Sequence, residues 1–356
     1  MDADALIAWY RREGRSLPWR ASRRAGRVVP PDPWAVFVSE AMLQQTQVAT
    51  VLPYFDRFLR QFPEPADLAA AAESDVLKAW EGLGYYRRAR NLQAAARAMV
   101  EMHGGRVPAD LDALLALPGV GRYTAGAVLS NAFDRRAPIV DGNVARVLAR
   151  HHGITEPVDG TAGSRQLWQH ADELAQAASS PRDINQALME LGALICTPRG
   201  PRCLFCPVAD TCRAHRDGDP ESLPRKKAKK PPVAVDHHTL ILCRSDRVLL
   251  RERPARGLWA GLWEFPTEEA GAAPDAAAIK SAFGLEAESG AAMPAFVHPT
   301  THRTITFRPR IWHVTGGRLR ARTGSWSSLR DAGDRPLARP QSRILAWLTD
   351  VHATHP

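Results

Sequence analysis

The sequence predicts two domains, an all-α domain over residues 1–214 and an α+β domain over residues 233–356. Its 356 residues exceed the length of one typical domain, and each part is long enough to bury its own core. Before about residue 214, apolar residues recur at i, i+3 and i+4, which is helical spacing. After residue 232 they alternate along short runs, as in strands. This change of period is the main reason for the division.

Helices are predicted first where the helical spacing is strongest. These runs cover residues 68–80, 94–102, 125–133 and 144–151. No stretch before residue 214 alternates convincingly, so we expect no strand there. Residues 215–232 are polar, contain prolines and end in a basic run, which is typical of a linker. Its lysines could contact phosphate, but a solvated tether is the simpler interpretation.

The C-terminal domain begins with two strand-like runs joined by a tight polar connection, residues 239–243 and 247–251. Two further runs follow at 304–307 and 310–314, and helical spacing returns at 275–283 and 341–348. This mixture predicts an α+β domain of ordinary size.

Charge and hydropathy narrow the class of protein. The net charge is +9 and the isoelectric point is about 9.7, which favours a polyanionic partner, nucleic acid first. No apolar stretch approaches the length of a membrane span, and the N-terminus is acidic and then amphipathic, unlike a secretory signal. We therefore expect a cytoplasmic protein, in a reducing compartment where Cys243 stays unpaired.

Four of the five cysteines lie in one short run, Cys196-x6-Cys203-x2-Cys206-x5-Cys212. Four thiolates in one small loop can hold a cluster of several irons, each sulfur binding one metal. A structural zinc site more often uses two separated C-x2-C pairs, and only Cys203 and Cys206 have that spacing. A disulfide framework does not suit an intracellular protein. The interpretation is a [4Fe-4S] cluster first and zinc second, with a purely structural role for the metal left open.

A glycine turn separates two helical runs in the middle of the N-terminal domain. Residues 111–117 are helical, Pro118-Gly-Val-Gly121 interrupts them, and helical spacing resumes at residue 124. Such a pair predicts a helix-hairpin-helix. Without Cβ atoms at Gly119 and Gly121, backbone amides at the second helix's N-terminus can approach a phosphate. These contacts position a protein on DNA without reading sequence. An ordinary helical corner is the alternative.

Several motifs together resemble a known family. The segments 117–125 (LPGVGRYTA) and 140–144 (VDGNV), with the cysteine run, are similar to the endonuclease III superfamily of helix-hairpin-helix DNA glycosylases. The segments 39–48 (SEAMLQQTQV) and 82–86 (GLGYY) resemble, within it, the MutY family of adenine DNA glycosylases. The resemblance covers almost the whole chain. It implies a helical catalytic domain with an iron–sulfur loop at 196–212, followed by a Nudix-like domain.

Glu40 is the first candidate catalytic residue. Cleaving an N-glycosidic bond needs a proton on the leaving base and negative charge near the developing sugar cation, which two carboxylates can supply. Asp32 and Pro33 are a plausible N-cap and first helical residue, so Glu40 lies about two turns into a helix beside apolar Val36 and Leu43. Burial there would raise its pKa, as a general acid requires. The resemblance implies that it protonates adenine N7; an exposed helix-edge glutamate is the alternative.

Asp141 is the second candidate carboxylate. It precedes a helical run, so an N-cap alone could explain it. The resemblance assigns it stabilisation of the sugar cation or of a covalent sugar intermediate, with Asn143 orienting it.

Tyr123 indicates the reaction class. Bifunctional relatives carry a lysine at this position of the hairpin, which attacks the sugar and forms a Schiff base. Because tyrosine cannot do so, the resemblance implies a monofunctional enzyme that leaves an abasic site. A packing aromatic is the alternative.

Further residues are assigned by resemblance to contacts with DNA. Gln45 and Leu43 are expected on the Glu40 helix, with Leu43 in contact with DNA. Gln45 and Tyr85 would wedge into the duplex while adenine is flipped out. Glu190 would line the adenine pocket together with Trp19 and Arg20. The alternatives are an ordinary core aromatic for Tyr85, a helix-face Glu190 and an anchoring Trp–Arg pair.

The second domain resembles a Nudix-type domain at residues 257–266 (GLWAGLWEFP). The following helix, 276–285 (AAAIKSAFGL), lacks the glutamates that hold metal in Nudix hydrolases, so a hydrolase activity of this domain is implausible. In the MutY family the domain recognises 8-oxoguanine. Thr301 and His302 match its contact loop, whereas Thr300 replaces an aromatic residue. Residues 21–32 read as a small basic insertion of unknown purpose.

The resemblance therefore implies a monomeric base-excision-repair enzyme of the cytoplasm and nucleoid. It would hydrolyse the N-glycosyl bond of adenine paired with 8-oxoguanine or guanine in double-stranded DNA, with no membrane partner. Two alternatives are open. One is a bifunctional enzyme for oxidised pyrimidines, which Tyr123 and the second domain argue against, and the other is a catalytically silent iron–sulfur DNA sensor.

Overall fold

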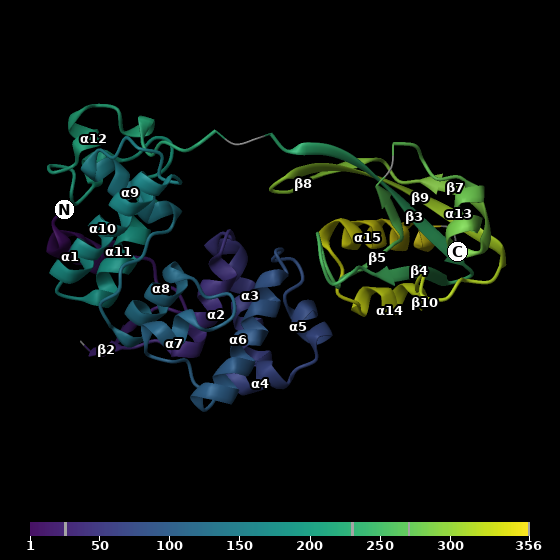
Figure 1. Ribbon diagram of the computed structural model, residues 1–356, viewed down its shortest axis with the longest axis horizontal. Helices are drawn as coiled ribbons and strands as arrows, with labels where there is room; N and C mark the ends of the chain where they lie inside the picture. Colours follow the sequence, from purple (N-terminus) through teal and green to yellow (C-terminus); the bar gives the residue numbers. More distant parts are fainter. Residues whose placement is uncertain (25–26, 229–230, 270, 355–356) are drawn as a thin grey trace. The chain divides into compact units, whose positions relative to one another are not determined.

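The computed structural model describes residues 1–356 apart from 25–26, 229–230, 270 and 355–356 (Figure 1). The chain divides into two compact units: the first contains Met1–Ala70 and Asn91–Lys229, and the second contains Ala71–Arg90 and Lys230–Pro356. Residues 71–90 thus group with the C-terminal part, although their helical spacing had suggested the N-terminal domain. Of the described residues of the expected linker, 215–228 belong to the first unit and 231–232 to the second.

The first unit is helical, as its apolar spacing predicts. Its helices are α1 (Ala3–Glu13), α2 (Pro33–Leu43), α3 (Val48–Gln61), α4 (Pro65–Ala70), α6 (Arg87–His103, which begins in the second unit), α7 (Leu111–Leu115), α8 (Arg122–Phe133), α9 (Gly142–His152), α10 (Thr161–Ala177), α11 (Pro181–Leu194) and α12 (Arg213–Arg216), with 3-10 turns at Cys203–Phe205 and Pro220–Ser222. None of the helices that the structure describes has both the length and the apolar character needed to span a bilayer.

Three of the predicted helical runs, 94–102, 125–133 and 144–151, lie within α6, α8 and α9. The run predicted over 68–80 is instead two helices, α4 and α5 (Glu73–Ala79). The helix is interrupted because the backbone of Ala72 is extended, with φ −66° and ψ 141°. The boundary between the two units falls at this interruption.

Local signals explain where the site helices begin and end. The Asp141 side chain accepts a hydrogen bond from a backbone amide in the first turn of α9, and left-handed Gly153 ends that helix. Asp32 caps α2, and Pro33 occupies its first turn, where a missing N–H costs nothing. Ser180 caps α11 in the same way as Asp141 caps α9. The two caps predicted from sequence, Asp32 and Asp141, are confirmed.

One apolar core joins α1, α8, α9, α10 and α11. Half-buried Tyr123, Cys196 and Cys206 pack against it, so the candidate hairpin and the cysteine loop rest on the same scaffold. Burial of this core supplies the main driving force for bringing them together.

The first unit also contains a small hairpin that was not expected. Strands β1 (Ser22–Arg24) and β2 (Arg27–Val29) pair antiparallel, with Ser22 opposite Val29. They form within the basic insertion proposed at 21–32. The prediction of no strand in this part of the chain was wrong because three-residue strands are too short for alternation to be visible.

The second unit contains one mixed sheet with helices, in addition to α5 and the start of α6. Its central order is β10-β4-β3-β9-β7, with β5 on β4, β6 on β3 and β8 on β9. Long parallel pairing of β3 with β9 forms its middle. The bounds are β3 (Val233–Arg244), β4 (Arg247–Glu252), β5 (Trp263–Glu264), β6 (Thr267–Glu269), α13 (Ala276–Phe283), β7 (Leu285–Ala292), β8 (Phe296–Pro299), β9 (Arg303–Gly317), β10 (Ser325–Ser328), α14 (Leu329–Asp334) and α15 (Arg339–Thr354).

The strands predicted at 239–243 and 247–251 lie within β3 and β4, and the predicted helices lie within or next to α13 and α15. The runs 304–307 and 310–314 are one strand, β9, because its pairing with β3 continues through Arg308 and Pro309.

Alternate residues of the sheet face different helices. Leu240, Leu242 and Leu249 pack with residues of α13, whereas Ile241 and Val248 pack with residues of α15. This follows from the two-residue period of a strand. The expected combination of a helical domain and an α+β domain is confirmed.

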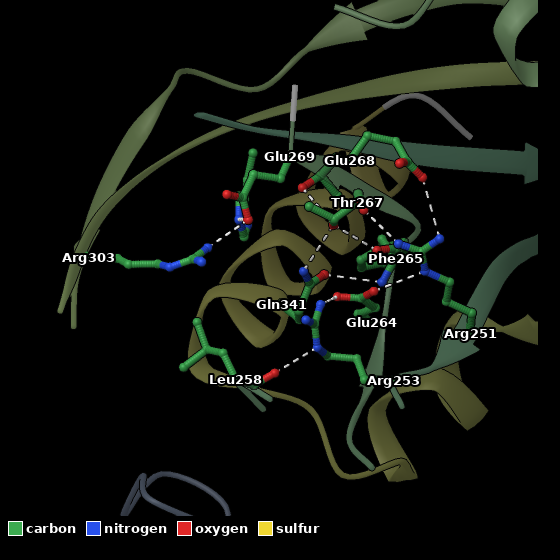
Figure 2. A network of polar contacts seen from close by, with 12 residues as sticks. Arg251, Arg253, Leu258, Glu264, Phe265, Thr267, Glu268, Glu269, Arg303 and Gln341 are labelled. Atoms are coloured by element: carbon green, nitrogen blue, oxygen red, sulfur yellow. Dashed lines mark hydrogen bonds and ion pairs between the residues drawn. The ribbon is translucent and has the colours of Figure 1, made fainter. Parts of the chain in front are cut away.

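Polar contacts fix the end of β5 and the neighbouring strand β4 (Figure 2). Glu264, which is 2% exposed, accepts hydrogen bonds from Arg251 Nε at 2.9 Å and from Arg253 Nη1. Gln341 of α15 accepts a hydrogen bond from the Phe265 amide at 3.1 Å. These contacts join two strands and a helix through groups that are buried or half-buried.

We predict that Glu264→Gln destabilises the second unit by about 3 kcal/mol, because two arginines lose their buried carboxylate. Urea unfolding of the full chain, followed by tryptophan fluorescence, measures the change. Glu269→Gln is the matched control: Glu269 is half-exposed and binds Arg303, so its loss should cost less than about 1 kcal/mol. Equal effects of the two substitutions would contradict this assignment.

Candidate active site

Glu40 lies in the middle of α2, where the sequence predicts a buried face. Nearly all of α2 is buried, and Glu40 is 3% exposed. Its Oε1 accepts one long hydrogen bond from Asn131 Nδ2, at 3.4 Å, and its Oε2 has no hydrogen-bond partner among the described residues. A buried carboxyl with so little support favours its neutral form.

The surroundings of Glu40 raise its pKa from 4.5 to about 7. Burial is the largest cause; the adjacent Tyr123 hydroxyl opposes it, and the negative charge of Asp141 adds to it. Arg20 and Asn131 lower the pKa by smaller amounts. The carboxyl is therefore protonated in a substantial fraction of molecules near neutral pH, as the sequence-based hypothesis requires of an acid.

Asp141 stands at the N-terminus of α9, close enough for its charge to act on Glu40. Its Oδ1 accepts from the Val144 amide at 2.7 Å, and its Oδ2 accepts from Asn143 Nδ2 at 3.3 Å. Burial raises the pKa of Asp141, while the hydrogen bonds from Val144 and Asn143 oppose the increase. Asp141 is thus both a helix cap and a carboxylate beside Glu40.

Tyr123 lies in the first turn of α8 and stays neutral. Burial, followed by the charges of Glu40 and Asp141, raises its pKa well above 10. Its hydroxyl donates to Met189 Sδ at 3.5 Å. The structure thus brings three of the predicted catalytic residues together.

The hairpin expected between the two helical runs is present, with α7 and α8 joined by the glycine turn. Gly119 has φ +77°, and a Cβ there would lie 2.6 Å from Asn91 Cβ, so this position requires glycine. Gly121 has ordinary backbone geometry, and its face is open. The α8 N-terminus, where Gly121 makes no side-chain cap, therefore exposes backbone amides.

Arg146 links α9, the helix that begins after Asp141, to the cysteine loop, a role that the sequence analysis missed. Its Nη2 donates to Asn143 Oδ1 at 2.9 Å and to Gly192 O at 2.7 Å, and its Nε donates to Cys196 O at 2.7 Å. Asn143, the predicted orienting residue, is therefore held by Arg146 as well as by Asp141. The i, i+3 spacing from Asn143 was the available signal.

The four cysteines of the run are free thiols that line one small apolar pocket. Arg150, which is 2% exposed, reaches across it: Nη1 lies 3.4 Å from Cys196 Sγ and donates to Thr197 O at 2.7 Å. No three His, Cys, Asp or Glu side chains of the described residues are arranged to hold a single metal ion. The four thiols around one pocket instead fit a larger group that each sulfur contacts separately.

A second pocket, of about 260 Å³, is lined by polar and aromatic side chains, including Asn131, the hydrogen-bond partner of Glu40. Trp19, Arg20, Asn131 and Gln186 are among its lining residues. Arg20 Nε and Gln186 Oε1 are buried and have no hydrogen-bond partner in the described part of the chain, which leaves one donor and one acceptor available there. The sequence-based hypothesis identified Trp19 and Arg20; Asn131 and Gln186 were missed, although each is a polar residue within an apolar helical run.

Glu190 is not among the described residues that line this pocket, and its place in an adenine pocket stays a prediction. It is fully buried and binds two arginines that line the pocket: Arg15 Nε at 2.6 Å and Arg20 Nη2 at 2.7 Å. Burial works against ionisation of Glu190, yet the hydrogen bonds from Arg15 and the charge of Arg20 outweigh it and lower the pKa to about 2. Glu190 is an ionised anchor for the pocket wall.

Leu43 lies on the Glu40 helix, as predicted, whereas Gln45 does not. Helix α2 ends at Leu43, and Gln45 follows in a turn with φ +60°, a conformation that cannot continue a helix. Gln45 is exposed and Leu43 is half-buried.

The remaining predicted residues lie in the second unit. Tyr85 is 51% exposed with φ +47°, and its hydroxyl lies 3.2 Å from Thr301 Oγ1. Thr300 and Arg303 close the turn between β8 and β9 through their hydrogen bonds, which leaves Thr301 and His302 exposed at its tip. The structure thus brings Tyr85 and Thr301 together.

We predict that Glu40→Gln makes the folded protein more stable. The unfolded chain loses the Glu40 proton near pH 4.5 and the folded chain near pH 7, so ionisation destabilises the fold as pH rises between these values. Above pH 7 the ionisation of Glu40 lowers the free energy of unfolding by about 3 kcal/mol. Urea unfolding should show a gain of that order at pH 8 and almost none at pH 4.5. An equal gain at both pH values would assign it to packing instead.

Two segments match known protein families. Residues 38–171 match the HhH-GPD superfamily of base excision DNA repair proteins, and residues 237–347 match the NUDIX domain.

Relatives match along a larger part of the chain. Adenine DNA glycosylase of Homo sapiens is 42% identical over 311 residues, which are 74% of this chain and 56% of that protein. Adenine DNA glycosylase of Buchnera aphidicola subsp. Schizaphis graminum is 30% identical over 344 residues, 96% of each. The chain spans 56% to 59% of the length of its mammalian relatives. A solved thermostable thymine-DNA glycosylase aligns with TM-score 0.53 and 30% identity over 60% of this chain and 95% of that one. The chain belongs to the adenine DNA glycosylase family.

Proposed function

We propose that this protein is a monofunctional DNA glycosylase of base excision repair that hydrolyses adenine from pairs with 8-oxoguanine or guanine. The observation that carries the proposal is the buried Glu40 carboxyl, with its pKa near 7 and one unpartnered oxygen, beside Asp141. Family membership supplies the substrate class, because the relatives are named adenine DNA glycosylases.

Glu40 acts as the acid. In its protonated form it donates a proton to N7 of adenine, so that the base can leave with the electrons of the C1′–N9 bond. The pocket lined by Trp19 and Arg20 receives the flipped base, with the free Gln186 oxygen and the Arg20 Nε–H as its polar partners.

Asp141 carries the complementary role. Its carboxylate lies near the developing sugar cation and stabilises it, while Asn143 and the Val144 amide fix its orientation. Water then adds at C1′ to give an abasic site. Tyr123 cannot form a Schiff base, so no lysine adduct and no coupled strand cleavage follow.

Double-stranded DNA is the partner. The open amides of the α8 N-terminus after Gly121 suit a backbone phosphate. Exposed Gln45 and Tyr85, with Leu43, are proposed to wedge into the duplex, and Thr301 and His302 to contact the opposite base. Thr300 offers no aromatic face there. We further propose that the protein works as a monomer in the cytoplasm, at the nucleoid, without a membrane partner.

The residues of the cysteine loop fit a [4Fe-4S] cluster held by Cys196, Cys203, Cys206 and Cys212. When bound, such a cluster supplies redox chemistry, which base hydrolysis does not use. The proposed role is therefore structural: the loop orders Arg199 and Arg202 for contact with phosphate. Arg146 and Arg150 tie this loop to the helix that carries Asp141.

The proposal is tested by single-turnover release of adenine from duplexes in which it pairs with 8-oxoguanine, guanine or cytosine. We expect release opposite the first two and strand breaks only after alkali. Glu40→Gln should slow release by at least about 100-fold. The wild-type rate should fall as pH rises through about 7, because the acid form of Glu40 is lost.

Asn185→Ala is the control, since Asn185 is buried on α11 and bonds Ser130 rather than a catalytic group. Its rate on folded protein should stay within a few-fold of wild type. Efficient borohydride trapping would support the bifunctional alternative, and wild-type DNA binding without adenine release would support the silent sensor.

For the cluster, we expect anaerobically purified protein to contain about four irons per chain and matching sulfide. Cys206→Ala should remove most of this iron and the visible absorbance. Cys243→Ala, a buried cysteine of the second unit, is the matched control and should retain both. Zinc in place of iron, or equal iron loss from both variants, would overturn the assignment.

A further inference from the structure

The turn between α5 and α6 has an unusual backbone. Gly82 and Gly84 have φ values of +100° and +70°, and Tyr85 follows with φ +47°. A left-handed tyrosine is uncommon and persists only where neighbouring contacts hold it. The turn presents this tyrosine half-exposed.

Contacts inside the segment fix one side of the turn. Trp80 Nε1 donates to Gly84 O at 3.1 Å, and Arg88 Nη2 donates to Leu83 O at 3.0 Å and to Gly84 O at 3.2 Å. The Arg88 guanidinium also lies over the Tyr85 ring, 5.4 Å from its centroid. These bonds satisfy the carbonyl groups of Leu83 and Gly84, which the irregular backbone of the turn leaves outside a helix.

Contacts to the Nudix-like part of the same unit fix the other side. Ser342 Oγ on α15 donates to Glu81 Oε1 at 2.9 Å, and Lys78 Nζ binds Glu81 Oε2 at 2.7 Å. The same lysine donates to Gly333 O at 2.5 Å. We name these three side chains, Lys78, Glu81 and Ser342, the brace.

A second anchor follows immediately after the turn. The hydroxyl of Tyr86, which is 6% exposed, donates to Leu337 O at 3.0 Å. The turn is therefore attached on both sides to α14, α15 and the segment between them. Tyr85, at its tip, meets Thr301 at 3.2 Å.

We infer that Glu81 and Ser342 are positioning residues that hold Tyr85 against Thr301, so that discrimination of the base opposite adenine depends on the brace. This inference rests on the proposed function, which makes Tyr85 the wedge and Thr301 a contact to the opposite base. Neither Glu81 nor Ser342 touches DNA in this role. They act by fixing the backbone from which Tyr85 projects.

Geometry favours positioning over general stabilisation. Ser342 is only half-buried and lies on a helix where alanine is well tolerated, so its loss should leave the fold intact. Glu81 directly precedes Gly82, the first left-handed residue, so movement of its side chain bears on the whole turn. Release of this anchor should therefore loosen Tyr85 before it unfolds anything.

The test uses the full chain with Ser342→Ala. Amide hydrogen exchange of residues 82–86 is measured without DNA, and equilibrium affinities are measured for duplexes with adenine opposite 8-oxoguanine or guanine. We expect exchange about fivefold faster and the ratio of the two dissociation constants reduced about fivefold, from loss of one charge-assisted hydrogen bond. Ser342→Thr keeps the hydroxyl and should restore both values.

Thr349→Ala is the matched control, because Thr349 Oγ1 bonds only Leu345 O within α15. It should change neither value. Unchanged exchange in Ser342→Ala, or faster exchange with an unchanged affinity ratio, would overturn the inference. Because binding is measured rather than catalysis, wild-type protein that discriminates the duplexes but releases no adenine would sink the proposed reaction and leave this inference standing. Wild type that does not discriminate them would overturn it.

Discussion

The buried carboxyl of Glu40 is the constraint on which the rest of the first unit depends. It is buried, with one long hydrogen bond from Asn131 and, among the residues that the structure describes, no partner for Oε2. Its ionised form is therefore disfavoured, and its proton is retained towards neutral pH. A fold can hold such a group only if other contacts offset the cost. The burial of nearly all the remaining side chains of α2 offsets this cost. The burial that keeps Glu40 protonated near neutral pH therefore also lowers the stability of the fold around it.

Two buried glutamates in this unit have opposite protonation states, and arginine makes the difference. Glu190 is as deeply buried as Glu40, but hydrogen bonds from Arg15 and Arg20 hold its pKa near 2. Glu40 feels Arg20 only weakly and the negative charge of Asp141 as well, so burial dominates. Arg20 therefore mainly stabilises the ionised form of Glu190 and has only a small effect on Glu40. Separation of pKa values between neighbouring carboxyl groups is a common mark of divided acid and base roles.

Residues whose role follows from local sequence were predictable. Asp32 and Asp141 are helix caps, and the apolar neighbours of Glu40 place it on a buried face, so both carboxyl groups could be located without coordinates. Gln45 and Glu190 could not, because a left-handed turn and a pair of arginine contacts arise from tertiary structure. Arg150 is similar: nothing in a helical arginine indicates that it will cross the cysteine loop. The hairpin at β1 and β2 was too short to leave a pattern, and the grouping of residues 71–90 with the C-terminal part depends on contacts distant in sequence.

Because residues 71–90 group with the Nudix-like domain, this domain has a structural role: it anchors the turn between α5 and α6. Helix α13 carries no Asp or Glu, so the position where a metal-dependent hydrolase would keep its ligands holds apolar side chains, Lys280 and Ser281. The acidic groups of this domain instead serve structure: Glu264 gathers two arginines, and Glu269 binds Arg303 at the start of β9. Other contacts of the domain reach outward to the turn that presents Tyr85. If Tyr85 contributes, as proposed, to distinguishing one opposite base from another by its position, the turn that carries it must be held rigidly, and these contacts hold it.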